Sequence, residues 1–376
     1  MKGKTLILQF LYQSIIKRIL FLFDPETVHN RMLNLGEFLG KFRVSKWMVK
    51  FCFYYYHPSL KQELLNLTFK NPVGLAAGFD KNGKLTQILP EVGFGFMEIG
   101  SVSDRSCSGN EKPRLWRLKK FMSLRVHYGL PSEGASAVAE RLGSLPFSIP
   151  LGINIVKTND AQTDSIEDGI KDYERAFKKF LPLTCYFTIN ISCPNTFGGE
   201  PFLEAENLDK LLSRIDALKG KQAVVVKLSP DLSESRLDAL LKVIMRHKID
   251  GIICSNLTKV RDAQNVRDKQ VPGEGGFSGR LVEEASNELI KKVYRKTAGK
   301  ITIIGCGGVF SAEDAYKKIK LGASLIQLVT GMIYEGPQLI GEINRGLAEL
   351  TEKDGYKNIS EAVGVNNILA LTPSVS

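Results

Sequence analysis

Eight short apolar runs recur between residues 73 and 329, and longer stretches with helical periodicity separate them. This alternation is typical of repeated β/α units, in which each helix returns the chain to the same end of the sheet. Eight parallel strands predict a closed α/β barrel, the (β/α)8 or TIM barrel, and 376 residues accommodate that domain plus an appendage. An open doubly wound sheet is the alternative, but no GxGxxG motif follows the first run. The runs are Val73–Ala77, Phe96–Gly100, Pro150–Ile155, Phe187–Ser192, Ala223–Leu228, Gly251–Ser255, Ile301–Gly305 and Leu325–Val329, and the helical stretches include Ser165–Phe180, Leu208–Lys219, Glu234–His247 and Glu283–Ala298.

The segment before the barrel contains two apolar stretches that carry basic residues. In residues 6–23, thirteen of eighteen residues are apolar, and a helix would present an apolar face formed by Leu8, Leu11, Tyr12, Ile15, Ile19 and Leu22. The cations Lys17 and Arg18 argue against a membrane span for this stretch. No cleavage site for a signal peptide follows it. Residues 38–56 form the second stretch. The two helices either pack on the barrel or lie in a membrane surface, where they would admit a lipid-soluble substrate.

The distribution of charge favours the membrane surface over nucleic acid as a partner. The net charge is +11, and residues 1–60 hold nine Lys and Arg against three acidic residues, which gives that segment +6. Basic residues interleaved with large apolar ones suit an anionic lipid surface. The start of the chain lacks the Arg- and Ser-rich character of a transit peptide. We therefore expect a bacterial protein bound peripherally to the cytoplasmic face of the inner membrane. The six cysteines have no zinc-like spacing, which predicts a reduced protein without a metal site.

Polar residues lie at or just after the carboxyl ends of the predicted strands, where barrels carry their chemistry. They are Asp80 and Lys81, Ser101, Asn154, Asn190 with Ser192 to Asn195, Lys227, and Ser255 with Asn256. The loops after the seventh and eighth strands contain Gly305-Cys306-Gly307-Gly308 and Thr330-Gly331. Glycines let backbone N–H groups approach an anion, so these two loops predict a phosphate site.

Several of these segments together resemble the dihydroorotate dehydrogenases, in particular the quinone-dependent, membrane-associated class. The matching motifs are residues 69–81 (FKNPVGLAAGFDK), 98–102 (EIGSV), 112–118 (KPRLWRL), 152–155 (GINI), 190–195 (NISCPN), 226–232 (VKLSPDL), 275–280 (GGFSGR) and 303–308 (IIGCGG). Asp24-Pro25-Glu26-Thr27-Val28-His29 resembles the segment that marks the quinone-dependent class. We expect a helical membrane and quinone-access segment in residues 1–60, the barrel in residues 61–365 and a tail in residues 366–376.

The resemblance implies FMN as the cofactor, dihydroorotate and orotate as substrate and product, and a membrane quinone as the electron acceptor. The implied FMN-binding residues are Ala76, Ala77, Gly78, Ser101, Asn154, Asn190, Lys227, Ser255, Gly279, Gly308, Thr330 and Gly331. The implied substrate-binding residues are Lys81, Asn190, Asn195 and Asn256, the catalytic base is Cys193, and Arg117 would lie near the quinone. A thiol has a free pKa near 8.5, so we expect the lysines of the barrel mouth to favour its thiolate.

Four positions depart from the pattern of the quinone-dependent class. That class has a serine base, whereas Cys193 matches the soluble class. Val126 stands where the family has a substrate-binding asparagine, with His127 in place of the neighbouring arginine, and Leu257 stands where a hydroxyl residue is usual. These departures leave two alternatives open: a related FMN enzyme acting on another dihydropyrimidine, and a non-catalytic flavin-binding membrane protein.

Overall fold

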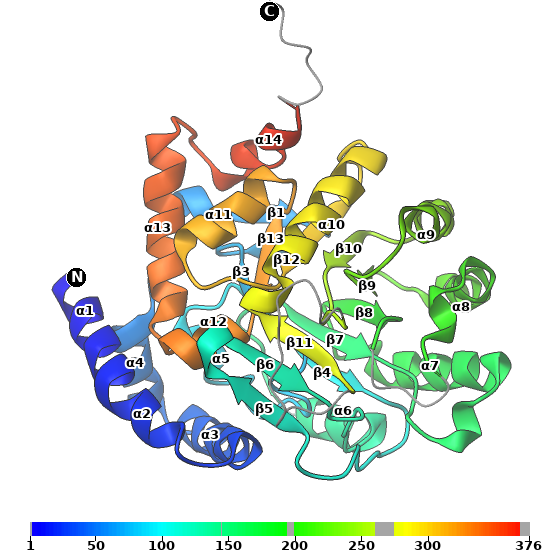
Figure 1. The fold of residues 1–376 in the computed structure, drawn as a ribbon, viewed down its shortest axis with the longest axis horizontal. Coiled ribbons are helices and arrows are strands. Elements are labelled where there is room, and N and C mark those ends of the chain that lie inside the picture. The colour runs from blue at the N-terminus through cyan, green and yellow to red at the C-terminus, as the bar shows by residue number, and fades with distance from the viewer. Residues whose placement is uncertain (1, 144, 194–198, 260–273, 369–376) are drawn as a thin grey trace, which may run out of the picture.

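The centre of the protein is a closed barrel of eight parallel strands, as the sequence predicts (Figure 1). The computed structural model describes residues 2–143, 145–193, 199–259 and 274–368. Around the barrel the strand order is β10, β12, β13, β3, β4, β7, β8 and β9. Every predicted run supplies one strand, and each strand ends within two residues of its prediction: β3 and β8 end two residues earlier, and β10 and β13 end one residue earlier. The bounds are β3 Val73–Leu75, β4 Phe96–Val102, β7 Leu151–Ile155, β8 Tyr186–Asn190, β9 Ala223–Leu228, β10 Gly251–Cys254, β12 Thr302–Cys306 and β13 Leu325–Leu328.

Helices surround the barrel because each buries one apolar face against the strands. In α7, Ser165 caps the amino end by accepting a hydrogen bond from the Asp168 N–H, and Phe177 stacks on Phe187 of β8 at 3.9 Å between ring centroids. The four predicted helices are present, and each of their ends lies within three residues of the prediction. The helices of this layer are α5 Leu89–Val92, α6 Ala135–Gly143, α7 Ile166–Phe180, α8 Ala205–Leu218, α9 Glu234–Arg246, α10 Glu283–Lys296, α11 Ala312–Lys320, α12 Thr330–Glu335, α13 Leu339–Lys353 and α14 Val365–Ile368.

The amino-terminal end of the barrel is closed by apolar side chains. Phe69 and Phe96 meet edge to face at 5.3 Å, and they pack with Tyr186, Ile304 and Leu325 in one buried cluster. The hairpin of β1 (Gln62–Leu64) and β2 (Leu67–Phe69) adds its leucines to this cluster. Access to the barrel interior is therefore confined to the opposite, carboxyl end.

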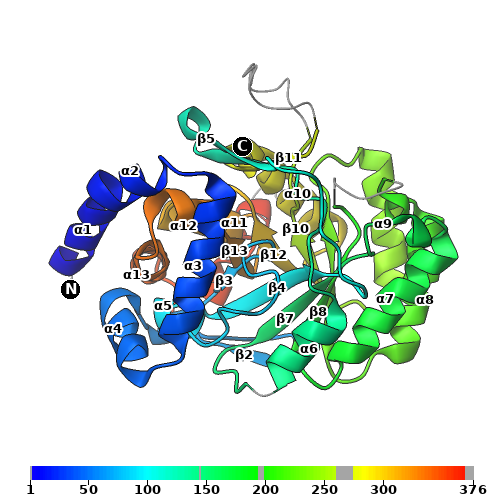
Figure 2. The ribbon, with the colours of Figure 1, turned by 90° about the horizontal axis from the view of Figure 1, so that it is seen from below.

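A small antiparallel sheet stands at the carboxyl end and was not predicted from the sequence. It consists of β5 (Leu115–Leu118), β6 (Ser123–Val126) and β11 (Gly276–Gly279), in the order β11, β6, β5 (Figure 1). Figure 2 shows β5 and β11 from a second direction. Four-residue strands are too short to show a clear alternation of apolar and polar residues. This sheet brings two parts of the chain about 150 residues apart in sequence beside the barrel mouth.

The N-terminal segment is helical, but its helices differ from the predicted ones. The first stretch forms α1 (Lys2–Leu11), a π-helical turn (Tyr12–Ile16) and α2 (Lys17–Leu20). The second prediction was wrong at its start, because residues 38–40 end α3 (Pro25–Gly40) and a break precedes α4 (Arg43–Phe53). Helix α3 begins where it does because the Asp24 carboxylate accepts the Thr27 N–H at 2.7 Å and Pro25 occupies the first helical position.

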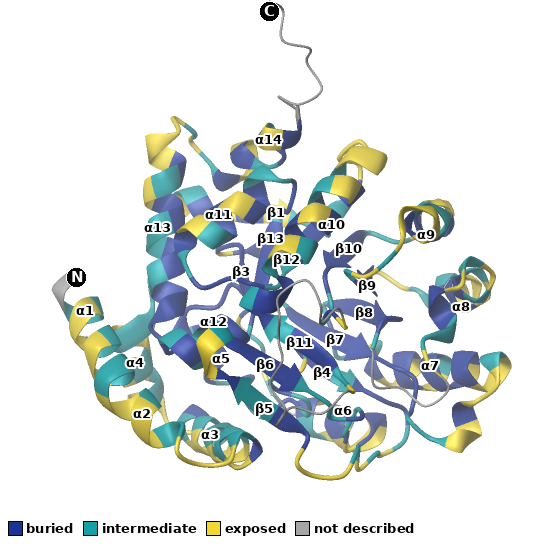
Figure 3. Ribbon diagram, in the orientation of Figure 1, coloured by how far each residue is buried: buried dark blue, intermediate teal, exposed yellow. Residues whose placement is uncertain are grey.

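The first stretch docks on the barrel through its polar side chains. The Tyr12 hydroxyl donates to the Ile333 carbonyl oxygen at 2.8 Å, and Gln13 Nε2 donates to the carboxylate of Glu335 at 2.6 Å. Tyr12 therefore belongs to the docking side and not to the predicted apolar face. Leu11, Ile15, Ile19 and Leu22 of that face are exposed (Figure 3). Within the described residues, no helix combines the length and the apolar character that crossing a membrane requires.

Candidate active site

One cavity of about 500 Å³ begins at the carboxyl end of the barrel and extends to the N-terminal helices. It collects nearly all of the residues that the sequence singled out. Asn154 does not line it, and Asn195 lies outside the described residues. The predicted residues that line it are Ala76, Ala77, Gly78, Lys81, Ser101, Arg117, Asn190, Cys193, Lys227, Ser255, Asn256, Gly279, Gly308, Thr330 and Gly331.

Four polar side chains at the strand ends form a continuous chain of hydrogen bonds. Ser101 donates to Asn154 at 2.5 Å, Asn190 donates to Ser101 at 3.0 Å, and Asn256 donates to Asn190 at 3.2 Å. The chain crosses from β7 through β4 and β8 to the residues after β10. Each amide thereby has a fixed orientation, so the groups left facing the cavity are fixed as well.

Beneath this chain lies Glu98, a fully buried carboxylate in β4 that we did not single out from the sequence. It accepts hydrogen bonds from Asn154 and Thr188, each at 2.8 Å, from Gln327 at 3.1 Å and from Tyr186 at 3.3 Å. The bond from Asn154 Nδ2 leaves the Asn154 carbonyl oxygen free to accept from Ser101. Asn154 thus acts on the cavity through Ser101. A glutamate in the middle of an apolar run was the available sequence signal.

Lys227 places a positive charge at the cavity wall. It is the fifth residue of β9 and only 5% exposed. Among the residues that the structure describes, its ammonium group has no hydrogen-bond acceptor and no carboxylate within ion-pair distance. A buried cation is stabilised only by a partner, and the cavity is the place where that partner can bind. An electron-rich, partly anionic ring system such as a flavin fits this requirement.

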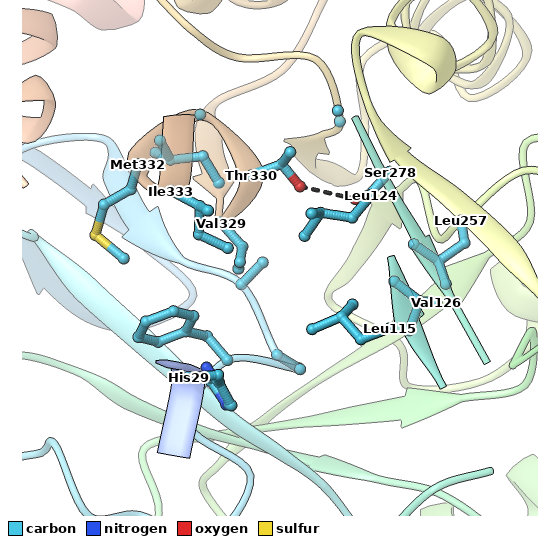
Figure 4. A pocket seen from close by; sticks show the side chains of 18 of the residues that line it. His29, Leu115, Leu124, Val126, Leu257, Ser278, Val329, Thr330, Met332 and Ile333 are labelled. Atoms are coloured by element: carbon cyan, nitrogen blue, oxygen red, sulfur yellow. Dashed lines mark hydrogen bonds between the residues drawn. The ribbon is translucent and has the colours of Figure 1, made fainter. Parts of the chain in front are cut away.

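The two predicted phosphate loops lie together at one side of the cavity. Gly307 and Gly308 have φ angles of +117° and +74°, a conformation that glycine adopts readily. Gly331 packs so closely that a Cβ atom there would lie 2.0 Å from the Val309 carbonyl oxygen. Across the loops, the Thr330 and Ser278 hydroxyl groups are 2.8 Å apart (Figure 4). Backbone N–H groups without bulky side chains around them suit a phosphate group.

Cys193 follows β8 directly and lines the same cavity. The residue before it is anchored, because Asn256 Nδ2 donates to the Ser192 carbonyl oxygen at 2.7 Å and the Ser192 hydroxyl donates to the Lys227 carbonyl oxygen at 2.9 Å. The Asn190 carbonyl oxygen accepts from the buried Tyr173 hydroxyl at 2.7 Å. These bonds fix the backbone that carries the thiol, as a catalytic base requires.

Lys81 lies after the first barrel strand at the edge of the cavity. Its ammonium group donates to the Gly78 carbonyl oxygen at 3.0 Å and lies 4.1 Å from the centroid of the Tyr128 ring. Removal from bulk water lowers the pKa of Lys81 to about 8, with Glu26 opposing this shift and Arg114 adding to it. The group is therefore charged at neutral pH and can bind a carboxylate.

The N-terminal helices form the other end of the cavity. Arg117 of β5 donates to the Phe23 carbonyl oxygen at 2.7 Å, and its guanidinium lies 4.5 Å from the Phe21 ring centroid. His29 of α3 packs edge to face on Phe79, and burial, together with the charge of Lys81, lowers the pKa of His29 to about 3, so its ring is neutral. This end is predominantly apolar, with Ile16, Leu20, Val28 and Met32 among its lining residues.

The two apolar departures noted in the sequence both line the cavity. Figure 4 shows Val126 and Leu257 on the same side as Leu115, facing Val329, Met332 and Ile333 across it. Their side chains offer no hydrogen bond to a ligand. Polar side chains elsewhere in the lining include those of Lys81, Asn190 and Asn256.

Comparison with known proteins decides the family. The sequence profile of dihydroorotate dehydrogenase matches residues 59–351. The chain belongs to the dihydroorotate dehydrogenase family. A member from Sulfurovum sp., named dihydroorotate dehydrogenase (quinone), is 39% identical over 364 residues, covering 95% of this chain and 99% of its own. A member of the same name from Nautilia profundicola is 36% identical, covering 94% and 96%.

Solved structures agree with this membership in the dihydroorotate dehydrogenase family. The crystal structure of DHODH from Eimeria tenella in complex with ferulenol superimposes with a TM-score of 0.82 at 28% identity, and the match covers 93% of this chain and 96% of the other. The match extends from the barrel into the N-terminal segment, because 93% of the chain exceeds the length of residues 61–376.

Proposed function

We propose that this protein oxidises dihydroorotate to orotate and passes the electrons to a membrane quinone, a step in pyrimidine biosynthesis. The observation that carries the proposal is the continuous cavity: one end holds Cys193, Lys81 and the asparagines, and the other lies among apolar N-terminal helices. A polar, anionic substrate suits the first end and a lipid-soluble acceptor suits the second.

FMN is the cofactor we propose for the barrel mouth. Ala76, Ala77, Gly78, Ser101, Asn190, Lys227 and Ser255 would hold the ring system, and Gly279, Gly308, Thr330 and Gly331 would hold the ring edge and the phosphate, with Asn154 acting through Ser101. When bound, FMN supplies the hydride acceptor that oxidation of a carbon–carbon single bond needs. The positive charge of Lys227 stabilises negative charge on the neighbouring ring system.

The residues of this chain bind the substrate and remove its proton. Lys81 pairs with the substrate carboxylate, while Asn190 and Asn256 donate to and accept from the amide-like edge of the ring, with Asn195 proposed for the same role. Cys193, as thiolate, takes the proton from the substrate carbon next to the one that loses hydride, and a carbon–carbon double bond forms. The chain of hydrogen bonds from Asn154 to Asn256 holds the asparagines in register for this step.

We propose that residues 1–60 bind peripherally to the cytoplasmic face of a bacterial inner membrane, with residues 61–365 as the catalytic barrel. In the described part of the chain, all large exposed hydrophobic residues except Met245 lie between Leu6 and Tyr56. They include Phe10, Trp47 and Phe51, and basic residues such as Arg43 and Lys46 lie among them. Exposed apolar side chains flanked by cations favour an anionic lipid surface.

Anaerobic addition of dihydroorotate to the purified protein tests the proposal. We expect the flavin absorbance to bleach rapidly and to return when a quinone is added. A flavin that dihydroorotate leaves unchanged, but that another dihydropyrimidine reduces, would assign this cavity to a different substrate and would make Val126 and Leu257 its determinants.

A further inference from the structure

Lys318 is a fully buried lysine in the last turn of α11, and its side chain points toward α10. Its ammonium group donates to the Ser286 hydroxyl at 2.9 Å and to the Asn287 side-chain oxygen at 2.8 Å. Both partners are neutral. An ammonium group has three N–H donors and a full charge, so these two bonds solvate it only in part.

No carboxylate of the described residues lies within ion-pair distance of Lys318, unlike its neighbours on the same helix. Lys317 pairs with Glu284 at 3.4 Å, and Lys320 pairs with Asp354 at 3.5 Å. Burial lowers the pKa of Lys318 to about 8, which leaves it mainly protonated at neutral pH. Burying a charge without an opposite charge is strongly unfavourable, so a compensating anion is expected nearby.

The acidic residues closest to this region already have a partner. Arg280 contacts the Glu283 carboxylate at 2.6 Å and the Asp314 carboxylate at 3.0 Å. Arg280 thus offsets one of these two negative charges. The other acts on Lys318 only from beyond ion-pair distance, so an anion bound at the glycine loop would stabilise the buried ammonium group further.

Lys318 is linked directly to the back of the glycine loop. The Ser286 hydroxyl accepts a hydrogen bond from Lys318 and donates one to the Cys306 carbonyl oxygen at 2.7 Å. The Cys254 carbonyl oxygen is a second acceptor for the same hydroxyl at 3.2 Å. A Cβ atom at Gly307 would lie 3.4 Å from the Cβ of Ser286. Two hydrogen bonds therefore connect the buried cation to the backbone of the glycine loop, and Cys306, Gly307 and Gly308 of that loop line the cavity.

We propose that Lys318 is the buried counter-charge of the cofactor phosphate and that it makes the protein prefer a phosphorylated flavin over riboflavin. The inference rests on the proposed FMN site. Backbone N–H groups offer partial charges only, whereas the phosphate carries close to two negative charges. A full positive charge behind the loop, shielded from solvent, attracts the phosphate through a region of low dielectric constant.

The test compares Lys318→Met with Lys317→Met, a matched variant that removes one positive charge from the exposed side of the same helix. Release of fluorescent flavin from the diluted holoproteins is followed first, and each protein is then titrated with FMN and with riboflavin. For Lys318→Met we expect FMN affinity to fall by roughly tenfold to a hundredfold. Riboflavin affinity should change by less than about threefold, and Lys317→Met should match the wild type in both.

An equal loss of FMN and riboflavin affinity in Lys318→Met would overturn the inference, because it would indicate a general packing defect. Should this variant fail to fold, Lys318→Gln retains a hydrogen-bond donor without the charge and must show the same selective loss. The wild-type protein offers a further check: its preference for FMN over riboflavin must persist at high salt, because the charge is buried. Wild-type protein that binds neither flavin would instead contradict the proposed cofactor.

Discussion

Arg117 donates a hydrogen bond of 2.7 Å to the carbonyl oxygen of Phe23, and this bond ties the sheet at the barrel mouth to the end of the first helical stretch. The Phe21 ring packs against the same guanidinium at 4.5 Å. One side chain therefore both closes the cavity wall and offers a positive charge to its apolar end. A quinone carbonyl that enters between the helices would meet this group.

Arg117→Ala is expected to impair the reaction with quinone and to leave the reduction of the flavin by dihydroorotate intact. A hydrogen bond to a charged group contributes about 1.5–3 kcal/mol, so the KM for quinone should rise roughly tenfold or more. The rate of flavin reduction by dihydroorotate should stay unchanged in stopped-flow absorbance. Lys120→Ala, which removes a neighbouring charge, serves as the control. Loss of flavin reduction in Arg117→Ala would contradict the assignment of substrate and quinone to opposite ends of the cavity.

Cys193→Ala is expected to keep the flavin bound and to slow its reduction by substrate. General base catalysis contributes about 10²–10⁴-fold, and the alanine variant loses all of it. The measurement is the rate of anaerobic bleaching at saturating dihydroorotate. Cys185→Ala removes a free thiol outside the cavity and should react like the wild type. Unchanged bleaching in Cys193→Ala would assign the base to another residue.

Substrate affinity is expected to weaken as the pH rises through about 8. Only the protonated form of Lys81 pairs with the substrate carboxylate, and its pKa is lowered to about 8. KM for dihydroorotate should therefore be constant below that pH and rise by up to about tenfold per pH unit above it. Between pH 8 and about 10.5, Lys81 is protonated in the unfolded chain but largely deprotonated in the folded protein. The unfolded chain therefore binds more protons in this range, and the free energy of unfolding should rise with pH there. A flat KM profile from pH 6 to 10 would refute the role of Lys81.

Glu98→Gln is expected to destabilise the barrel and to perturb the flavin. Glu98 accepts four hydrogen bonds, and the amide of glutamine turns one acceptor into a donor that faces donors. Each unsatisfied buried group costs about 1–3 kcal/mol, which denaturant unfolding can measure. Asn154 and Ser101 should lose their fixed orientation and shift the flavin absorbance maximum. The exposed Glu63→Gln is the control, and equal stability of both variants would rule out the structural role of Glu98.

Membrane association is expected to depend on the exposed apolar residues of the N-terminal helices. Phe10→Ser combined with Trp47→Ser should reduce cosedimentation with anionic vesicles by roughly tenfold or more, because each residue loses the transfer of a large side chain. Met245→Ser changes the exposed hydrophobic residue on α9 and should leave binding intact. Vesicle binding that survives the double substitution would place the membrane contact elsewhere.

The sequence predicted the barrel well because its signal is periodic. Eight apolar runs became the eight strands, and the polar residues after them converged on one cavity because parallel strands share their carboxyl end. The small sheet that carries Arg117 and Val126 was missed because its strands contain four residues each. Tyr12 was placed on the wrong side of its helix because hydropathy does not reveal a hydroxyl bonded to Ile333.

Two buried charged residues, Glu98 and Lys318, were missed by the sequence reasoning. Glu98 and Lys318 stand in segments whose pattern predicts a strand and a helix, and nothing in that pattern identifies their partners. Glu98 is hydrogen-bonded to Gln327, which is 229 residues away in the sequence, and Lys318 is hydrogen-bonded to Ser286, which is 32 residues away. Such pairings follow from closure of the barrel and become visible only in three dimensions.

The bond between Tyr12 and Ile333 joins residues 321 positions apart, which has a consequence for how the chain is made. Ribosomes add about 5–20 residues per second, so the first helices wait roughly 15–65 s before their docking site on α12 exists. Throughout that interval their apolar side chains have lipid available but no barrel. Docking on the barrel therefore cannot precede the synthesis of α12, and the proposed contact of these helices with the bilayer would be able to form first.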